Sequence, residues 1–230
     1  MSLTRCMFAL SVAGACASMS SAAHVNATFN SVGPGVGVSV SIDSGANWLG
    51  TSAGLMNFTK NSGGPDLANS YGAFCCDIPK HIGFGGTYDW NRSNLEDAPT
   101  PSSAPFNPMG VAKADKISEL FGRFRGGLST NEQFGGFQIA VWTIIYGNGV
   151  LAFSGGDRFD SATFAVQGNL GAGANAQAFL AAVDGSGPRM GGLYALTSDA
   201  VNGPQDQIVP APGAMSLGML GGLVIARRRR

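Results

Sequence analysis

The chain has 230 residues, a length that fits one domain together with processing segments. Only 12% of the residues are charged and the formal net charge is zero, which excludes a highly charged disordered chain and gives no support for nucleic-acid binding. The 35 glycines follow no collagen-like period, so the composition is typical of many short strands and turns.

The first 23 residues have the layout of a secretory signal peptide. Arg5 supplies the positive start, Cys6–Ala17 is a short apolar stretch, and Ser21–Ala23 is a small-x-small cleavage site. We therefore expect residues 1–23 to be removed and an exported body to run from His24 to residue 208.

Alternating apolar residues predict strands at both ends of this body. Apolar side chains recur at every second position through much of residues 24–58, and turn signals stand at Pro34-Gly35 and at residues 43–45. Residues 71–78 predict a strand that carries Cys75 and Cys76 on opposite faces. Residues 191–196 and 207–209 predict closing strands.

Three other segments predict helices. Residues 113–124 have helical apolar spacing, and residues 172–183 are rich in alanine. The helix over residues 132–146 has Thr130 or Asn131 as its cap and Gly147 as its stop.

We therefore expect a mainly β fold with a small helical insertion, an α+β arrangement. The strands before Cys75 and after Gly147 are expected to form a β-sandwich or barrel covered by two or three helices.

The cysteines do not suggest a disulfide scaffold. Cys6 and Cys16 lie in the predicted signal peptide, so only Cys75 and Cys76 remain in the body. Adjacent cysteines close too short a ring to pair without strain. The two alternatives are a small buried hydrophobe and a reactive thiol.

The predicted central helix carries an unusual polar residue. Its sequence from Phe134 to Tyr146, FGGFQIAVWTIIY, is apolar almost all round apart from Gln138, which indicates a helix inside a core. A buried amide needs hydrogen-bond partners, or a reaction that removes the amide.

Residues 209–230 form a C-terminal segment of three parts. A proline-containing start, Val209–Gly213, precedes an apolar run from Ala214 to Ala226 and four arginines at 227–230. As a helix the run spans about 20 Å, less than a ~30 Å hydrocarbon core. The arginines fit cytoplasmic retention by the positive-inside rule.

This segment resembles the PEP-CTERM sorting signals of Gram-negative bacteria. The matching residues are Val209, Pro210, Ala211, Pro212, Arg227, Arg228, Arg229 and Arg230. The resemblance implies an exosortase-type processing enzyme as a partner, transient insertion of the C-terminal segment into the inner membrane as a transmembrane helix, and cleavage near Pro210–Pro212. The mature protein would then stay at the cell surface or become extracellular.

The body resembles the thioester domains of bacterial surface adhesins. Those domains pair an aromatic-Cys motif with a Gln-x-Ala-Ile-Trp motif, matched here by residues 74–77 and 138–142. The resemblance implies a thioester between Cys75 and Gln138. Phe74, Phe134, Phe137 and Trp142 could shield that bond from water.

These features predict adhesion through single-use covalent attachment to an amine or hydroxyl on a surface or matrix polymer. The alternative is a noncovalent structural component of a biofilm matrix, with reduced cysteines in its core. The sequence predicts no turnover enzyme, because its two histidines, His24 and His81, suggest no general base in a cluster. It gives no reason to expect a cofactor or a metal.

Overall fold

The computed structural model describes residues 24–64, 66–100, 107–200 and 202–210, so the predicted signal peptide and most of the predicted sorting signal lie outside the described residues. In chain order the strands are β1 (His24–Ser41), β2 (Leu49–Gly63), β3 (Ser70–Cys75), β4 (Thr87–Ser93), β5 (Ala152–Gly155), β6 (Arg158–Ser161), β7 (Phe164–Gln167), β8 (Leu193–Thr197) and β9 (Gln207–Pro210). The helices are α1 (Gly110–Phe124), α2 (Asn131–Tyr146) and α3 (Leu170–Ala182), with short 3-10 turns at Leu95–Asp97 and Arg125–Gly127.

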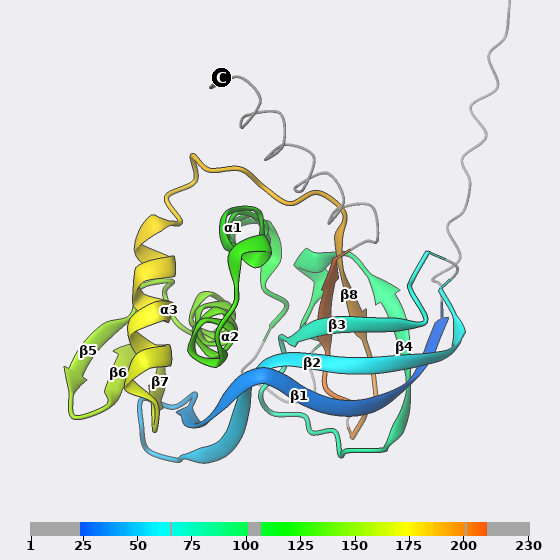
Figure 1. Cartoon of the computed structure of the whole chain (residues 1–230), viewed down its shortest axis with the longest axis horizontal. Coiled ribbons are helices and arrows are strands. Elements are labelled where there is room, and N and C mark those ends of the chain that lie inside the picture. The colour runs from blue at the N-terminus through cyan, green and yellow to red at the C-terminus, as the bar shows by residue number, and fades with distance from the viewer. Residues whose placement is uncertain (1–23, 65, 101–106, 201, 211–230) are drawn as a thin grey trace, which may run out of the picture.

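Six strands close into a barrel. Their order is β1-β2-β3-β9-β8-β4, and β4 returns to β1 in antiparallel register, with Val25 opposite Trp90. The mainly β prediction is confirmed, and the fold contains a barrel rather than a sandwich. Figure 1 shows the barrel on one side of the molecule, with the helices and β5–β7 on the other.

The predicted strand composition of the barrel is wrong in two respects. β4 follows Cys75 in the chain and still belongs to the barrel, while β5, β6 and β7 follow Gly147 and form an extension outside it. Within the described residues this extension joins the sheet through β7, which pairs with the end of β1 from Ser39 to Ser41.

The turn predicted at Pro34-Gly35 is also wrong, because β1 continues through it beside β2. The ladder shifts register between Val32 and Gly35, which accommodates a proline without a backbone donor. Gly35 and Gly54 then face each other so closely that a Cβ on Gly54 would meet the Pro34 oxygen at 2.5 Å. The turn predicted at residues 43–45 is confirmed, with Ser44 at φ 63° and Gly45 at φ 88°.

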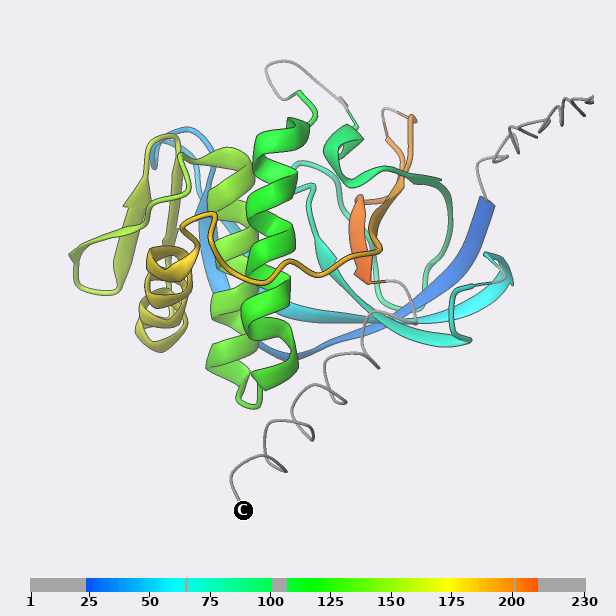
Figure 2. The same ribbon diagram turned by 90° about the horizontal axis from the view of Figure 1, so that it is seen from above.

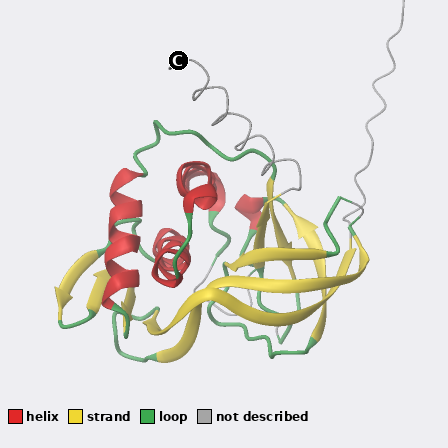
Figure 3. Cartoon of the chain, in the orientation of Figure 1, coloured by secondary structure: helices red, strands yellow, loops and turns green. Residues whose placement is uncertain are grey.

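The three predicted helices are confirmed. α2 begins at a capping box in which Thr130 and Gln133 each accept from the other's backbone N–H, and it ends at Gly147. Figures 2 and 3 show α2 between the barrel and α3, which explains why an almost wholly apolar helix is buried on nearly every side.

Small residues bring α2 close to its neighbours. A Cβ on Gly136 would lie 2.6 Å from the Asn175 Cβ and 2.8 Å from the Ala172 oxygen, both on α3. A Cβ on Gly135 would meet the Val36 side chain at 2.6 Å. Gly135 therefore sets how closely α2 approaches β1 of the barrel, and Gly136 how closely it approaches α3.

β9 runs two residues past the predicted end of the body. Val209 is buried opposite Tyr194, and Pro210 pairs with Leu193, so two residues of the predicted sorting signal are part of the barrel. Among the described residues, no helix has the length and hydrophobicity needed to cross a membrane.

We expect Gly136→Ala to lower the free energy of unfolding by about 1–3 kcal/mol, because the added methyl group would push α2 away from α3. The measurement is chemical denaturation followed by circular dichroism. Gly126→Ala is the matched control, since a Cβ there meets nothing within 4 Å. Equal effects of the two substitutions would contradict this account of the packing.

Candidate functional site

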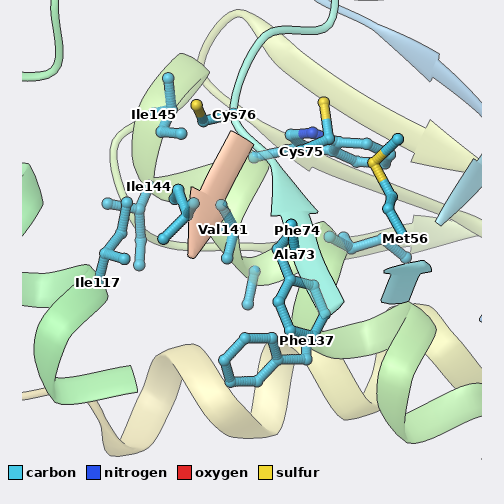
Figure 4. Close-up of a cluster of buried hydrophobic side chains, with 14 of the residues drawn as sticks. Met56, Ala73, Phe74, Cys75, Cys76, Ile117, Phe137, Val141, Ile144 and Ile145 are labelled. Carbon is cyan, nitrogen blue, oxygen red and sulfur yellow. The ribbon is translucent and has the colours of Figure 1, made fainter. Parts of the chain in front are cut away.

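Cys75 lies where strand β3 ends against helix α2. It is the last residue of β3 and pairs with Gln207 of β9. The side chains of Cys75 and Cys76 are both buried and neither forms a disulfide. In Figure 4 the Cys75 sulfur lies on the side of Met56, and the Cys76 sulfur lies beside Ile145.

The Gln138 side chain docks on the backbone of Cys75. Its Oε1 accepts from the Cys75 N–H at 2.9 Å, and its Nε2 donates to the Cys75 carbonyl at 2.8 Å. Gln138 is 1% exposed, so both bonds form away from water. The structure thus brings together the two predicted partners, and the amide carbon of Gln138 lies beside the residue that carries the thiol.

The environment of the Cys75 sulfur strongly disfavours a free thiolate. Burial raises the pKa of the thiol well above its ordinary range, while the Trp142 side chain and the Asp77 backbone N–H oppose that rise. The Asp77 N–H donates to the sulfur at 3.3 Å. The Trp142 indole N–H completes no hydrogen bond among the described residues, although it favours the thiolate.

A pocket of about 180 Å³ leads to Cys75. Trp142, Met56 and Phe29 line it together with His81 and Phe84 from the loop between β3 and β4. His81 is exposed, and Phe84 is 70% exposed while stacked on Phe29. The pocket therefore gives a small molecule a path from the surface to the sulfur.

A second contact from α2 holds the chain just after Cys75. The Tyr146 hydroxyl accepts from the Ile78 N–H and donates to the Cys76 carbonyl, both at 3.1 Å. Gln138 and Tyr146, two helical turns apart, thereby fix the backbone on both sides of the Cys75–Cys76 bond.

The four predicted shielding residues occupy different places. Trp142 lines the Cys75 pocket. Phe74 and Phe137 pack 4.7 Å apart, ring centre to ring centre, and Figure 4 shows them away from the Cys75 sulfur. The guanidinium carbon of Arg125 lies 5.4 Å from the centre of the Phe134 ring.

Several residues of the site were not predicted from the sequence. Met56, Phe29 and Phe84 come from separate segments, so no local pattern connects them with Cys75. Tyr146 was detectable in part, because it lies eight positions after Gln138 on the same helix and carries a hydroxyl into an apolar core.

A larger hollow of about 640 Å³ lies elsewhere on the barrel and does not include Cys75. Arg92, Asp97 and Tyr194 are among its lining residues. Arg92 is paired with Asp66 and lies over the Tyr194 ring, so its charge has partners already. Among the described residues no group of acidic, cysteine and histidine side chains is arranged to hold a metal ion.

The chain matches no protein-family model, no curated protein and no solved structure. The candidate site therefore depends on its own geometry, namely the thiol of Cys75, the amide of Gln138 and the pocket that opens beside them.

We expect alkylation of the Cys75 thiol to require unusually high pH in a Cys76→Ala/Gln138→Ala variant of the mature body. Because burial raises its pKa, the rate of reaction with iodoacetamide should rise with pH to an inflection well above the ordinary ~8.5 of cysteine. Adding Trp142→Phe should move the inflection higher, since it removes the indole N–H.

The urea-unfolded variant is the control, and its inflection should return to the ordinary value. An inflection at or below that value in the folded protein would contradict the described environment of the sulfur.

Proposed function

We propose that this chain is an exported cell-surface or matrix protein that attaches covalently to a target through a Cys75–Gln138 thioester. The observation that carries the proposal is the pair of hydrogen bonds, 2.9 and 2.8 Å long, that seats the Gln138 amide on Cys75. It is a self-modifying protein in this proposal, and not a turnover enzyme.

The bond would form by acyl transfer. The Cys75 sulfur attacks the amide carbon of Gln138, the C–N bond breaks, and ammonia leaves with the thiol proton. The Cys75 N–H already donates to Gln138 Oε1, so it can stabilise the negative charge that develops on that oxygen. The two hydrogen bonds to the Cys75 backbone support the proposal, because they hold the amide on the residue whose sulfur must reach its carbon.

Burial and the neighbouring pocket each support the proposed single-use reaction. Cys75 and Gln138 are 3% and 1% exposed, which limits hydrolysis of the stored bond by bulk water. The pocket lined by His81 and Phe84 brings an incoming amine or hydroxyl to Cys75, the residue that holds the acyl group in the proposed thioester. Attack by that nucleophile would free the Cys75 thiol and leave the target linked to Gln138.

The alternative is a noncovalent structural component of an extracellular matrix. The same two hydrogen bonds favour it, because they satisfy both polar atoms of Gln138 without any reaction. In that case Gln138 joins α2 to β3, and Cys75 and Cys76 are reduced core residues.

We expect the intact mature protein to be lighter than its sequence by the mass of one ammonia, and to show one titratable thiol after unfolding without nucleophiles. High-resolution mass spectrometry of the native protein measures the deficit. Gln138→Ala should abolish the deficit and restore a second titratable thiol.

Gln207→Ala is the matched control, because Gln207 is also buried and stands opposite Cys75 on β9. The deficit should survive this substitution. A wild-type protein without the ammonia deficit, and with both thiols titratable, would favour the noncovalent alternative.

We also propose export and C-terminal processing, on the sequence features alone. The mature chain should begin at His24 and end near Pro210–Pro212. Because β9 extends through Pro210, a cut after that residue leaves the barrel strand whole. Terminal peptide sequencing of the cell-surface or extracellular protein tests this. Replacement of Arg227–Arg230 by glutamine should leave the C-terminal segment uncut, and processing unchanged by that replacement would contradict the proposed signal.

A further inference from the structure

A buried lysine and two buried carboxyl groups lie just beyond the candidate thioester pair. Lys80, Asp77 and Asp206 are 5%, 2% and 0% exposed. The Lys80 Nζ lies 3.2 Å from Asp77 Oδ2 and 3.5 Å from Asp206 Oδ1. Charged groups are rarely buried so completely, because removing them from water costs several kcal/mol per ion.

The Lys80 amine is held in one place. It donates to the Thr100 hydroxyl at 2.9 Å and to the Ser198 carbonyl at 2.8 Å. These partners come from the loops that follow the 3-10 turn Leu95–Asp97 and strand β8. The nitrogen is thereby fixed in contact with both carboxyl groups.

The two carboxyl groups have different environments. Asp206 receives backbone N–H donors on both oxygens, from Ser198 at 2.9 Å and from Thr100 at 2.7 Å, and its Oδ2 also accepts from the Thr100 hydroxyl. Asp77 Oδ2 is buried and, among the described residues, has the Lys80 amine 3.2 Å away and no further hydrogen-bond donor. The donors on Asp206 can stabilise negative charge on its carboxyl oxygens, whereas Asp77 Oδ2 faces the amine alone.

The proton affinity of Asp77 also suits a proton carrier. Burial, followed by the charge of Asp206, raises the pKa of Asp77 to about 6, while the charge of Lys80 opposes the shift. A group with a pKa near neutrality can take up and return a proton at physiological pH.

We propose that Lys80 and Asp206 condense into an intramolecular isopeptide bond, with Asp77 as the group that carries the proton between them. This inference is independent of the proposed thioester, since it uses none of the same atoms.

The reaction balances without any added reagent. Asp77 takes a proton from the Lys80 ammonium, and the freed amine attacks the carboxyl carbon of Asp206. Asp77 returns this proton to one carboxyl oxygen of Asp206 and then carries a second proton from the attached nitrogen to the same oxygen, so that the C–O bond breaks and one water leaves. An ammonium and a carboxylate are thus converted to one amide and one water, and both charges disappear from the core.

The bond would join two distant parts of the chain at one point of the barrel. Lys80 follows β3, and Asp206 immediately precedes β9, the strand that pairs with β3. The Cys76 N–H already donates to the Asp206 carbonyl at 3.0 Å, which holds the two segments together before any reaction.

The test is intact mass and peptide mapping of the full mature protein after treatment with hydroxylamine, which converts a thioester to a hydroxamate one oxygen heavier than the original amide and leaves an isopeptide bond intact. We expect the treated protein to be lighter by one water than the chain that carries this hydroxamate. Trypsin should not cleave after Lys80, and a linked peptide containing Lys80 and Asp206 should be found.

Three variants complete the experiment. Lys80→Arg keeps the positive charge but lacks the nucleophilic amine, and it should remove the deficit and restore tryptic cleavage at that position. Asp77→Asn should slow the reaction at least tenfold, followed as the unlinked fraction over time after refolding. Lys113→Arg, at a lysine outside the cluster, is the matched control and should leave the deficit unchanged.

A wild-type protein with no deficit of one water once the hydroxamate oxygen is counted, and with normal cleavage after Lys80, would overturn the proposal even if every variant failed to fold. A missing ammonia deficit with the water deficit present would instead count against the thioester alone.

Discussion

The docking of the Gln138 carboxamide on the Cys75 backbone is the contact that joins the helical part of this molecule to its barrel at one defined point. Each polar atom of that amide is buried, and leaving one unpaired would cost about 1–3 kcal/mol. Most of α2 contributes apolar area, whereas the bonds from Gln138, and those from Tyr146 to Cys76 and Ile78, are directional and fix the helix along the chain they contact. Gly135 lets the helix lie close to β1 of the same barrel.

How much of this the sequence predicts depends on how local each signal is. The bounds of α2 were predictable, because a cap at Thr130, an apolar run and a stop at Gly147 lie within one segment. Closure of the barrel was not, since β4 and β8 pair across about a hundred residues with no local pattern that specifies partners. β1 passes through Pro34 because a register shift absorbs it, and that depends on the neighbouring strand.

The candidate site also combines residues that local motifs predict with residues that only the fold brings together. The proximity of Cys75 and Gln138 was expected from two short motifs, each contained in one strand or helix. The pocket around the sulfur combines β1, β2, α2 and the loop at His81, so it emerges only from the folded barrel. The partnership of Lys80 with Asp206 is similar, because the residues are 126 positions apart and each resembles an ordinary surface charge in the sequence.

Strand β9 has a mechanical consequence. Any pull on the chain beyond Pro210 enters the barrel through β9, which is flanked by β3 on one side and β8 on the other. The β3 side offers little resistance by itself, since its ladder joins only Phe74 with Ile208 and Cys75 with Gln207. The longer ladder of β9 with β8 would take most of such a pull, and a Lys80–Asp206 bond would add a covalent connection on the weaker β3 side.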